Sequence, residues 1–562
     1  MSAKGVGKAV ILDGYVDEPT ALGVPPYLAP YPRYVVGVFE IVGIPWHYTT
    51  IDAYRTDPAW AQRVADLEPS DLLVVIAGLT VPGHYRGGTP LTLHELRQIA
   101  SHCRATVMVG GPVRHGYTLT GGSAALDMGN LEGARVVHGE PALEVDAFVR
   151  QKDMVPQFSY QRISEMAVRG AAVAAAHPSA PRIIAEIETA RGCERTEHCS
   201  FCTEGLVQGC EFRPAAEIIA EIRALYQHGV RHFRLGKQPN FFAWPGRRDA
   251  AGVVRPAPQA IASLYRDIHE AAPELRTLHI DNVNPGFVAR HPDECLDIAR
   301  TVAEGNTPGD VAAMGVESVD PEVVRLNRLG CTPEEALKAI RIINRAGAVR
   351  QGASLPKLLP GLNFLYGLQG ETAATYETNY RFLLRLLEEG LLVRRINLRQ
   401  VMVFPGTPLH QWTAGKPKIN KVRFRRWKRR VQEDVEHPML QQVAPVGTIL
   451  PDVHTEFRDG DVTFGRQLAS YPILAGIPLR LGLRETLDAV VVGHGLRSVT
   501  VLPYPIKMNQ LSVKALCALP GVGKPRALRL ERARPFANVE KMLEALDDPS
   551  ALAPLSHLVK LD

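Results

Sequence analysis

The chain has 562 residues, of which 46% are hydrophobic and 22% charged, and its formal net charge is +5. This composition is that of an ordinary globular protein, and the mild positive charge permits an acidic partner without requiring one. Eight cysteines in so long a chain exclude a disulfide scaffold, and the lack of any apolar run of about 18 residues excludes a membrane span. The N-terminus has no signal-peptide pattern, so we expect a cytoplasmic protein of roughly three to five domains.

Short apolar strands alternate with helical segments in residues 1–150, which we expect to form one domain. The expected strands are 9–12, 71–77, 105–109 and 135–137, and the expected helices are about 33–43, 91–103 and 141–151. Continuous apolar strands separated by helices predict an α/β fold with a parallel, doubly wound, Rossmann-like sheet.

The turns after these strands supply candidate ligand-binding residues, because such sheets bind ligands beyond the carboxyl ends of their strands. The candidates in the turns are Asp13, Gly14, Thr80, Gly110, Gly111, Pro112, Gly139 and Glu140. On the loop at 78–87, His84 or Tyr85 is expected to lie closest to a bound ligand. The alternative is that His84 is a solvated loop histidine.

Residues 151–180 predict a linker. The segment contains glutamine and proline, then the alanine-rich stretch 171–176, and it closes on His177-Pro178. We therefore expect an exposed helix and turn that join two domains.

Three cysteines lie within ten residues, directly after an alternating, β-branched segment at 182–188 that predicts a strand. They are Cys193, Cys199 and Cys202. Three thiolates on one loop can hold three irons of a [4Fe–4S] cluster and leave the fourth iron open to a small molecule. A zinc site completed by His198 or Cys210 is one alternative, and unconnected buried cysteines are another.

Six strands separated by helices are expected in residues 181–415. They are 182–188, 232–236, 276–281, 312–317, 361–367 and 396–404. This pattern matches a partial (β/α)6 barrel, in which functional residues lie at the carboxyl ends of the strands. The candidates at those ends are Gln238, Glu317, Ser318, Asn363 and Arg399. The alternative for any one of these residues is that its side chain is a polar group hydrogen-bonded within the barrel and has no functional role.

Three further segments follow the barrel. Residues 416–445 predict a basic helical segment, since 416–430 hold nine basic residues and two aromatics, Phe424 and Trp427. Such a run can bind phosphates, or it can be a solvated helix face. Residues 446–505 predict a small β-rich unit. In residues 506–562, the turn at 519–523 resembles a helix–hairpin–helix motif, whose N–H groups bind anions. A packing module or a protein-docking hairpin is the alternative.

The cysteine loop resembles that of the radical S-adenosylmethionine (SAM) superfamily. The usual spacing is C-x3-C-x2-C, and here it is C-x5-C-x2-C, with Phe201 matching the aromatic residue before the last cysteine. Gly315-Val-Glu317-Ser318 resembles the family's Gly-x-Glu-Ser. The resemblance implies a [4Fe–4S] cluster that cleaves SAM to a 5′-deoxyadenosyl radical. It also implies that Gln238 and Ser318 lie near SAM, and that Glu317, Asn363 and Arg399 act at the reacting centre.

The order of strands and turns in residues 1–150 resembles the cobalamin-binding domain of radical SAM methyltransferases. The turn at 110–112 matches the place where that family lets the cobalamin tail approach the backbone, and the turn at 139–140 matches the turn after the family's last strand. The Asp-x-His-x-x-Gly signature of other cobalamin proteins is absent after the first strand. A flavodoxin-like fold without a ligand is the alternative. A methylthiotransferase with a second cluster is disfavoured, because residues 1–150 contain only one cysteine, Cys103.

These resemblances together imply a cobalamin-dependent radical SAM C-methyltransferase that methylates an unactivated sp3 carbon. Within the archaeal enzymes that end in a helix–hairpin–helix, the chain looks most like the glutamine methyltransferase of methanogens. The implied partners are the α subunit of methyl-coenzyme M reductase, or its peptide, and an external electron donor. The rival hypothesis is a nucleic-acid (tRNA) modifying or binding protein that uses the basic run and the hairpin.

Overall fold

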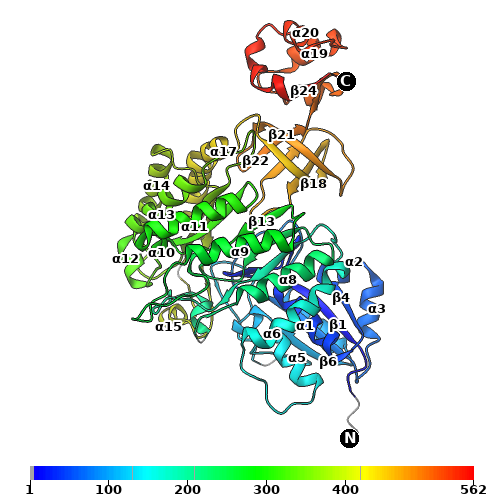
Figure 1. Ribbon diagram of the computed structural model, residues 1–562, viewed down its shortest axis with the longest axis vertical. Helices are drawn as coiled ribbons and strands as arrows, with labels where there is room; N and C mark the ends of the chain where they lie inside the picture. Colours follow the sequence, from blue (N-terminus) through cyan, green and yellow to red (C-terminus); the bar gives the residue numbers. More distant parts are fainter. Residues whose placement is uncertain (1–4, 130, 208, 418, 562) are drawn as a thin grey trace.

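The computed structural model describes residues 5–129, 131–207, 209–417 and 419–561 (Figure 1). An N-terminal α/β domain is followed by a partial β/α barrel, a small β-barrel and a helical C-terminal unit, which lies farthest from the N-terminal domain (Figure 1). None of the helices among these residues is long and apolar enough to cross a membrane.

The N-terminal domain has a parallel sheet in the order β4-β1-β5-β6-β8. Its strands are β1 (Ala9–Glu18), β4 (Trp46–Thr50), β5 (Leu72–Leu79), β6 (Thr106–Gly110) and β8 (Arg135–Val136), and β2 (Ala21–Leu22) folds back on β1. Its helices are α1 (Pro30–Val42), α2 (Ile51–Thr56), α3 (Pro58–Ala65), α4 (Leu93–His102) and α5 (Pro141–Val149). The order is flavodoxin-like, and its topological switch point lies between β1 and β5. All four predicted strands are confirmed, and β4 was missed.

The expectation of an exposed linker at 151–180 is wrong. Its helix α6 (Tyr160–Arg169) packs on α1 and buries Tyr160 and Ile163, and the short helix α7 (Val173–Ala176) follows. The two backbones touch where a Cβ at Gly37 would overlap the carbonyl group of Met166. Only a glycine permits so close a crossing, so residues 160–176 belong to the core, whereas Met154 and Val155 before them are exposed.

All six predicted barrel strands are confirmed. They are β9 (Ile184–Glu188), β12 (His232–Gly236), β13 (Thr277–Ile280), β14 (Asp310–Glu317), β15 (Leu358–Tyr366) and β16 (Arg395–Gln400). The helices between them are α8 (Ala215–Gln227), α9 (Pro258–Ala271), α10 (Pro285–Arg290), α11 (Pro292–Gly305), α12 (Pro321–Leu326), α13 (Pro333–Gly347) and α14 (Ala373–Glu388). Neighbouring strands run parallel, and one bridge from Asn282 to Ala313 joins the two halves of the arc.

Two short strands of the N-terminal domain pair with strands of the barrel. β3 (Tyr27–Leu28) runs parallel to β9, and β7 (Ser123–Ala124) runs parallel to β17 (Met402–Val403). The two domains therefore share main-chain hydrogen bonds at two separate places.

The basic segment forms helix α16 (Lys421–Val431), between α15 (Pro408–Thr413) and α17 (His437–Val443). Phe424 and Trp427 pack against Tyr366, Tyr376 and Tyr380 of the barrel. The two aromatic residues thus anchor the helix and do not form an exposed stacking surface, while phosphate binding by the basic residues stays a prediction.

The β-rich unit is a closed five-stranded barrel in the order β18-β19-β20-β22-β21. Its strands are β18 (Ile449–Asp459), β19 (Val462–Gln467), β20 (Leu474–Ile477), β21 (Thr486–His494) and β22 (Ser498–Pro503). Only β20 and β22 pair in parallel within it, a connectivity typical of OB-fold barrels. The last unit contains α18 (Val513–Leu516), α19 (Lys524–Ala533) and α20 (Val539–Glu544), and the remaining short strands are β10 (Ala190–Arg191), β11 (Glu211–Phe212), β23 (Ile506–Lys507) and β24 (Val559–Lys560).

Candidate active site

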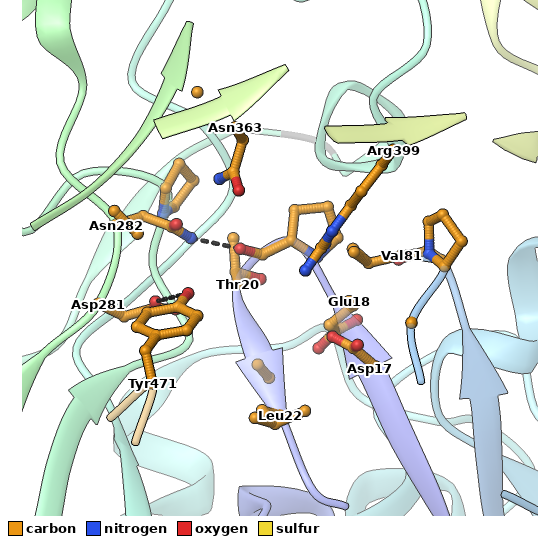
Figure 2. Close-up of a pocket in the computed structure, with 18 of the residues that line it drawn as sticks. Asp17, Glu18, Thr20, Leu22, Val81, Asp281, Asn282, Asn363, Arg399 and Tyr471 are labelled. Carbon is orange, nitrogen blue, oxygen red and sulfur yellow. Dashed lines mark hydrogen bonds between the residues drawn. The ribbon is translucent and has the colours of Figure 1, made fainter. Parts of the chain in front are cut away.

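A cavity of about 360 Å³ lies between the N-terminal domain and the carboxyl ends of the barrel strands. In Figure 2, Asn363 and Arg399 enter it from the barrel, opposite Asp17 and Glu18 at the end of β1. All three cysteines of the loop after β9 also line this cavity. The structure therefore brings the predicted cluster loop, the barrel and the N-terminal domain together in one place.

The cysteine loop is anchored to the turn after α12. Ser200 donates from its backbone N–H to the Asn327 carbonyl group at 3.0 Å and from its hydroxyl group to Asn327 Oδ1 at 2.8 Å. Burial raises the pKa of all three thiols, Cys193, Cys199 and Cys202. Bound iron would reverse that effect, because a metal cation stabilises the thiolate.

The two residues proposed to complete a zinc site do not lie with the three cysteines on the cavity wall. His198 and Cys210, the proposed fourth zinc ligands, do not line the cavity, and the Cys210 thiol instead faces the Gly192 carbonyl group at 3.4 Å. Among the described residues, no three His, Cys, Asp or Glu side chains are grouped to hold one metal ion. Phe201 lines the cavity between two of the cysteines, as the resemblance implies.

The three candidate catalytic residues, Glu317, Asn363 and Arg399, all line the cavity. Glu317 ends β14 at a bulge with φ +62°, a conformation that is costly for a residue with a side chain and is often found at functional sites. Burial raises the pKa of Glu317 to about 8, and Arg399 opposes this rise. Asn363 accepts a hydrogen bond from Asn397 Nδ2 at 2.8 Å, which fixes its side chain.

Two candidates from the barrel, Gln238 and Ser318, do not line the cavity. Gln238 is fully buried, and its Nε2 donates to the Leu235 carbonyl group at 3.0 Å. Ser318 is also buried and donates to Asn379 Oδ1 at 3.3 Å. Both side chains thus have a partner within the fold, although Gln238 Oε1 is buried without one, and their contact with SAM stays a prediction.

Of the N-terminal candidates, Thr80, His84 and Tyr85 line the cavity. Tyr85 donates to Asp17 Oδ2 at 2.5 Å, and burial raises the pKa of Asp17 to about 6. His84 has no hydrogen-bond partner among the described residues, so the structure brings it to the cavity wall without assigning it a contact.

The other N-terminal candidates lie away from the cavity, under side chains of the chain itself. The Gly14 carbonyl group accepts from the Leu91 N–H at 2.9 Å, and Asp13 accepts from the Tyr48 hydroxyl group at 2.8 Å. A side chain at Gly110 would meet Pro141 at 2.7 Å, which places the turn of Gly110, Gly111 and Pro112 in close packing. In the turn of Gly139 and Glu140, the Glu140 carboxylate pairs with Arg191 at 2.6 Å.

One wall of the cavity was not predicted, and it comes from the loop between β19 and β20. Tyr471 of this loop donates from its hydroxyl group to Asp281 Oδ1 at 3.1 Å (Figure 2). Asp281 also pairs with Arg234. The loop is held by backbone contacts, including Ser470 N–H to His279 Nδ1 at 2.9 Å. Tyr471 has φ +50°, which again marks strain at the cavity wall. The C-terminal barrel therefore completes the site.

Comparison with known proteins agrees with this geometry. Residues 187–383 match the model of the Radical SAM superfamily. An uncharacterized protein of Archaeoglobus fulgidus is 42% identical over 551 residues, covering 98% of this chain and 99% of its own length. The uncharacterized protein MJ0274 of Methanocaldococcus jannaschii is 39% identical and covers 88% of this chain and 93% of its own length.

More distant similarities were also found. A tRNA-2-methylthio-N(6)-dimethylallyladenosine synthase of Chlorobium chlorochromatii is 25% identical over 55% of this chain and 64% of its own length. The radical SAM methyltransferase TsrM of Kitasatospora setae, solved with tryptophan and a SAM analog, superposes with a TM-score of 0.45 at 16% identity, over 81% of this chain and 79% of that chain. The chain therefore belongs to the family of the two archaeal proteins, and its barrel is a radical SAM domain that uses a [4Fe–4S] cluster and SAM.

Proposed function

We propose that this radical SAM enzyme is a methyltransferase that acts on an unactivated sp3 carbon and uses cobalamin as its second cofactor. The observation that carries the proposal is the apolar surface that the N-terminal domain turns toward the cysteines. Leu22, Val24, Pro25, Val81 and Pro82 all line the cavity on that side. Such a surface suits the face of a corrin ring, and when bound, cobalamin would supply the methyl group.

The support concerns the ring of cobalamin, and binding of its tail by the turns at 110–112 and 139–140 stays a prediction. The turn at 110–112, where the resemblance places the tail, is closely packed, since a side chain at Gly110 would meet Pro141 at 2.7 Å, whereas a side chain at Gly139 would meet only Glu144, at 3.4 Å. The residues that would hold the ring are therefore those of β2 and of the loop at 80–87. Thr80, His84 and Tyr85 belong to this second group.

The chain's own residues have distinct parts in the proposed reaction. The three cysteines hold the cluster, and Glu317, Asn363 and Arg399 orient SAM and the substrate from the strand ends. The loop that carries Tyr471 closes the cavity against water. Positioning and exclusion of water are the main contributions of a protein whose cofactors carry the reactive steps.

For the substrate, we propose a glutamine side chain of a protein, with the methyl-coenzyme M reductase α subunit as the best candidate. The support is the sequence resemblance, together with a cavity that presents amide and guanidinium groups, Asn363 and Arg399, to a polar side chain. Mass spectrometry of a reductase peptide, incubated with enzyme, reductant, SAM and cobalamin, should show one added CH2 unit on glutamine. An unmodified peptide, in a reaction that still releases 5′-deoxyadenosine, would contradict this substrate.

Modification of tRNA is a second candidate, and two observations favour it. The tRNA-modifying synthase found above aligns with half of this chain, and OB-fold barrels commonly bind oligonucleotides. Total tRNA incubated in parallel with the peptide, and then digested to nucleosides, separates the two candidates. A methylated nucleoside without a methylated peptide would assign the enzyme to RNA.

Cobalamin binding should depend on β2 and not on the turn at 139–140. We expect Leu22→Trp to weaken binding by at least about tenfold, because the indole ring would occupy the space of the corrin. Gly139→Ala should leave binding unchanged, since this turn is away from the cavity. Titration of the purified protein with hydroxocobalamin, followed by absorbance, measures both. Weak binding by Gly139→Ala with normal binding by Leu22→Trp would place the ligand elsewhere.

A further inference from the structure

The longer first gap of the cysteine motif places an arginine against a cluster ligand. Arg195 is one of the five residues between Cys193 and Cys199. Its Nη1 donates to Cys199 Sγ at 3.0 Å, and the side chain lines the cavity. Arg195 is thus the cation in direct contact with the sulfur of one of the three predicted cluster ligands.

The guanidinium group is held in this position from its other side. Its Nη2 donates to the Arg328 carbonyl group at 2.9 Å and to the Leu329 carbonyl group at 3.1 Å. These carbonyl groups follow the C-terminal end of α12, where the helix dipole favours a cation. A planar guanidinium group can make both sets of contacts at once, whereas a lysine ammonium group has no such fork.

Glu194 acts on Arg195 through its charge, but Arg195 forms no ion pair with an acidic side chain of the described residues. Within the described part of the chain, no carboxylate lies within ion-pairing distance of it, so its nearest anionic partner would be the Cys199 thiolate of an assembled cluster. We therefore propose that Arg195 sets the reduction potential of the cluster. Reduction adds one electron from an external donor to the cluster and releases no group. The fixed positive charge and the N–H···S hydrogen bond stabilise the more negative, reduced form and so raise the potential.

The longer first gap of the cysteine motif thus has a consequence for the cluster. Hydrogen bonds to cluster sulfurs are one of the ways by which a protein tunes the potential, and the two added residues give the loop the length to carry such a donor. A higher potential makes the cluster easier to reduce by a weak donor and leaves less driving force for cleavage of SAM. This inference does not depend on the identity of the methyl acceptor or on cobalamin.

The test is a redox titration of the reconstituted full-length protein without SAM, followed by the EPR signal of the reduced cluster. Arg195→Met should shift the equilibrium toward the oxidised cluster by at least about tenfold, a fall of about 59 mV for one electron. Arg195→Lys, which keeps the charge and loses the fork, should lie between Arg195→Met and the wild type. Arg325→Gln removes an exposed guanidinium group of α12 and should leave the potential unchanged.

Iron content and absorbance of each variant establish that the same cluster is being compared. If Arg195→Met assembles less iron, the reduction potentials of Arg195→Lys and the wild type are compared instead. The lysine variant retains a positive charge on the loop, so the same cluster is expected to assemble. An unchanged potential in the arginine variants overturns the proposal, even if their affinity for SAM falls. Absence of peptide or tRNA methylation in the wild type would bear on the proposed function alone.

Discussion

Replacing Cys199 with alanine should abolish formation of 5′-deoxyadenosine. Cys193, Cys199 and Cys202 all line one cavity, on a loop that Ser200 anchors to the turn after α12. Two thiolates leave two irons of the cluster without a protein ligand, so the open iron that binds SAM is lost with the cluster. We expect the product to fall to the buffer background and the iron–sulfur absorbance to disappear. Chromatography of the reaction and the absorbance spectrum measure these losses.

The matched control for this variant is Cys517→Ala. Cys517 is exposed and lies in the helical C-terminal unit, away from the cavity. Its replacement should leave both iron content and SAM cleavage at the wild-type level. A Cys199→Ala protein that retains the cluster absorbance and cleaves SAM would show that another residue provides the third ligand.

Replacing Glu221 with alanine should cause the largest loss of stability. Glu221 of α8 accepts from Arg33 Nε at 2.9 Å and from Arg213 Nη1 at 2.5 Å, and all three side chains are fully buried. Arg33 lies on α1 of the N-terminal domain, so this cluster joins the two domains. Removing the carboxylate leaves two buried cations without their partner, which costs about 3–5 kcal/mol. The free energy of unfolding, from urea denaturation followed by circular dichroism, measures the loss.

A surface pair provides the comparison for Glu221. Glu68 pairs with Arg104 at 3.0 Å, and both side chains are more than half exposed. Because solvent screens such pairs, Glu68→Ala should leave the urea midpoint nearly unchanged. Equal midpoints for the Glu221 and Glu68 variants would mean that water or a rearranged acid compensates the two arginines.

The strands of the fold were predictable where each consisted of an apolar run. β5 and β6 are continuous apolar segments, and their limits agree with the sequence within a few residues. β4 was missed because Trp46–Thr50 contains polar residues on a strand at the edge of the sheet. The alanine-rich linker was misjudged for another reason. Alanines suit exposed helices, but here Gly170, just before them, lies against the backbone of α1 at Arg33 and Gly37, and only the tertiary structure shows this contact.

The site was predictable in the same local sense. The three cysteines lie on one loop, so their spacing in the sequence is enough to locate them. Glu317 and Asn363 were predicted from their positions at the ends of strands. Tyr471 could not be predicted in this way, because it reaches the cavity only when the C-terminal β-barrel packs on the β/α barrel. Its partner Asp281 lies 190 residues earlier in the chain. Gly110 lies in close packing, because a side chain there would meet Pro141, and its part in cobalamin binding stays a prediction.

The pairing of β3 with β9 and of β7 with β17 has a consequence for how substrates enter. Each contact is a stretch of parallel sheet, with main-chain hydrogen bonds such as Gly122 N–H to the Val401 carbonyl group at 2.7 Å. A hinge between the domains would have to break such bonds at both sites before the cavity widened. A large substrate would therefore enter by movement of cavity-wall segments that do not belong to a sheet, such as the loop at 80–87. Motions of such loops are much faster than rotations of whole domains.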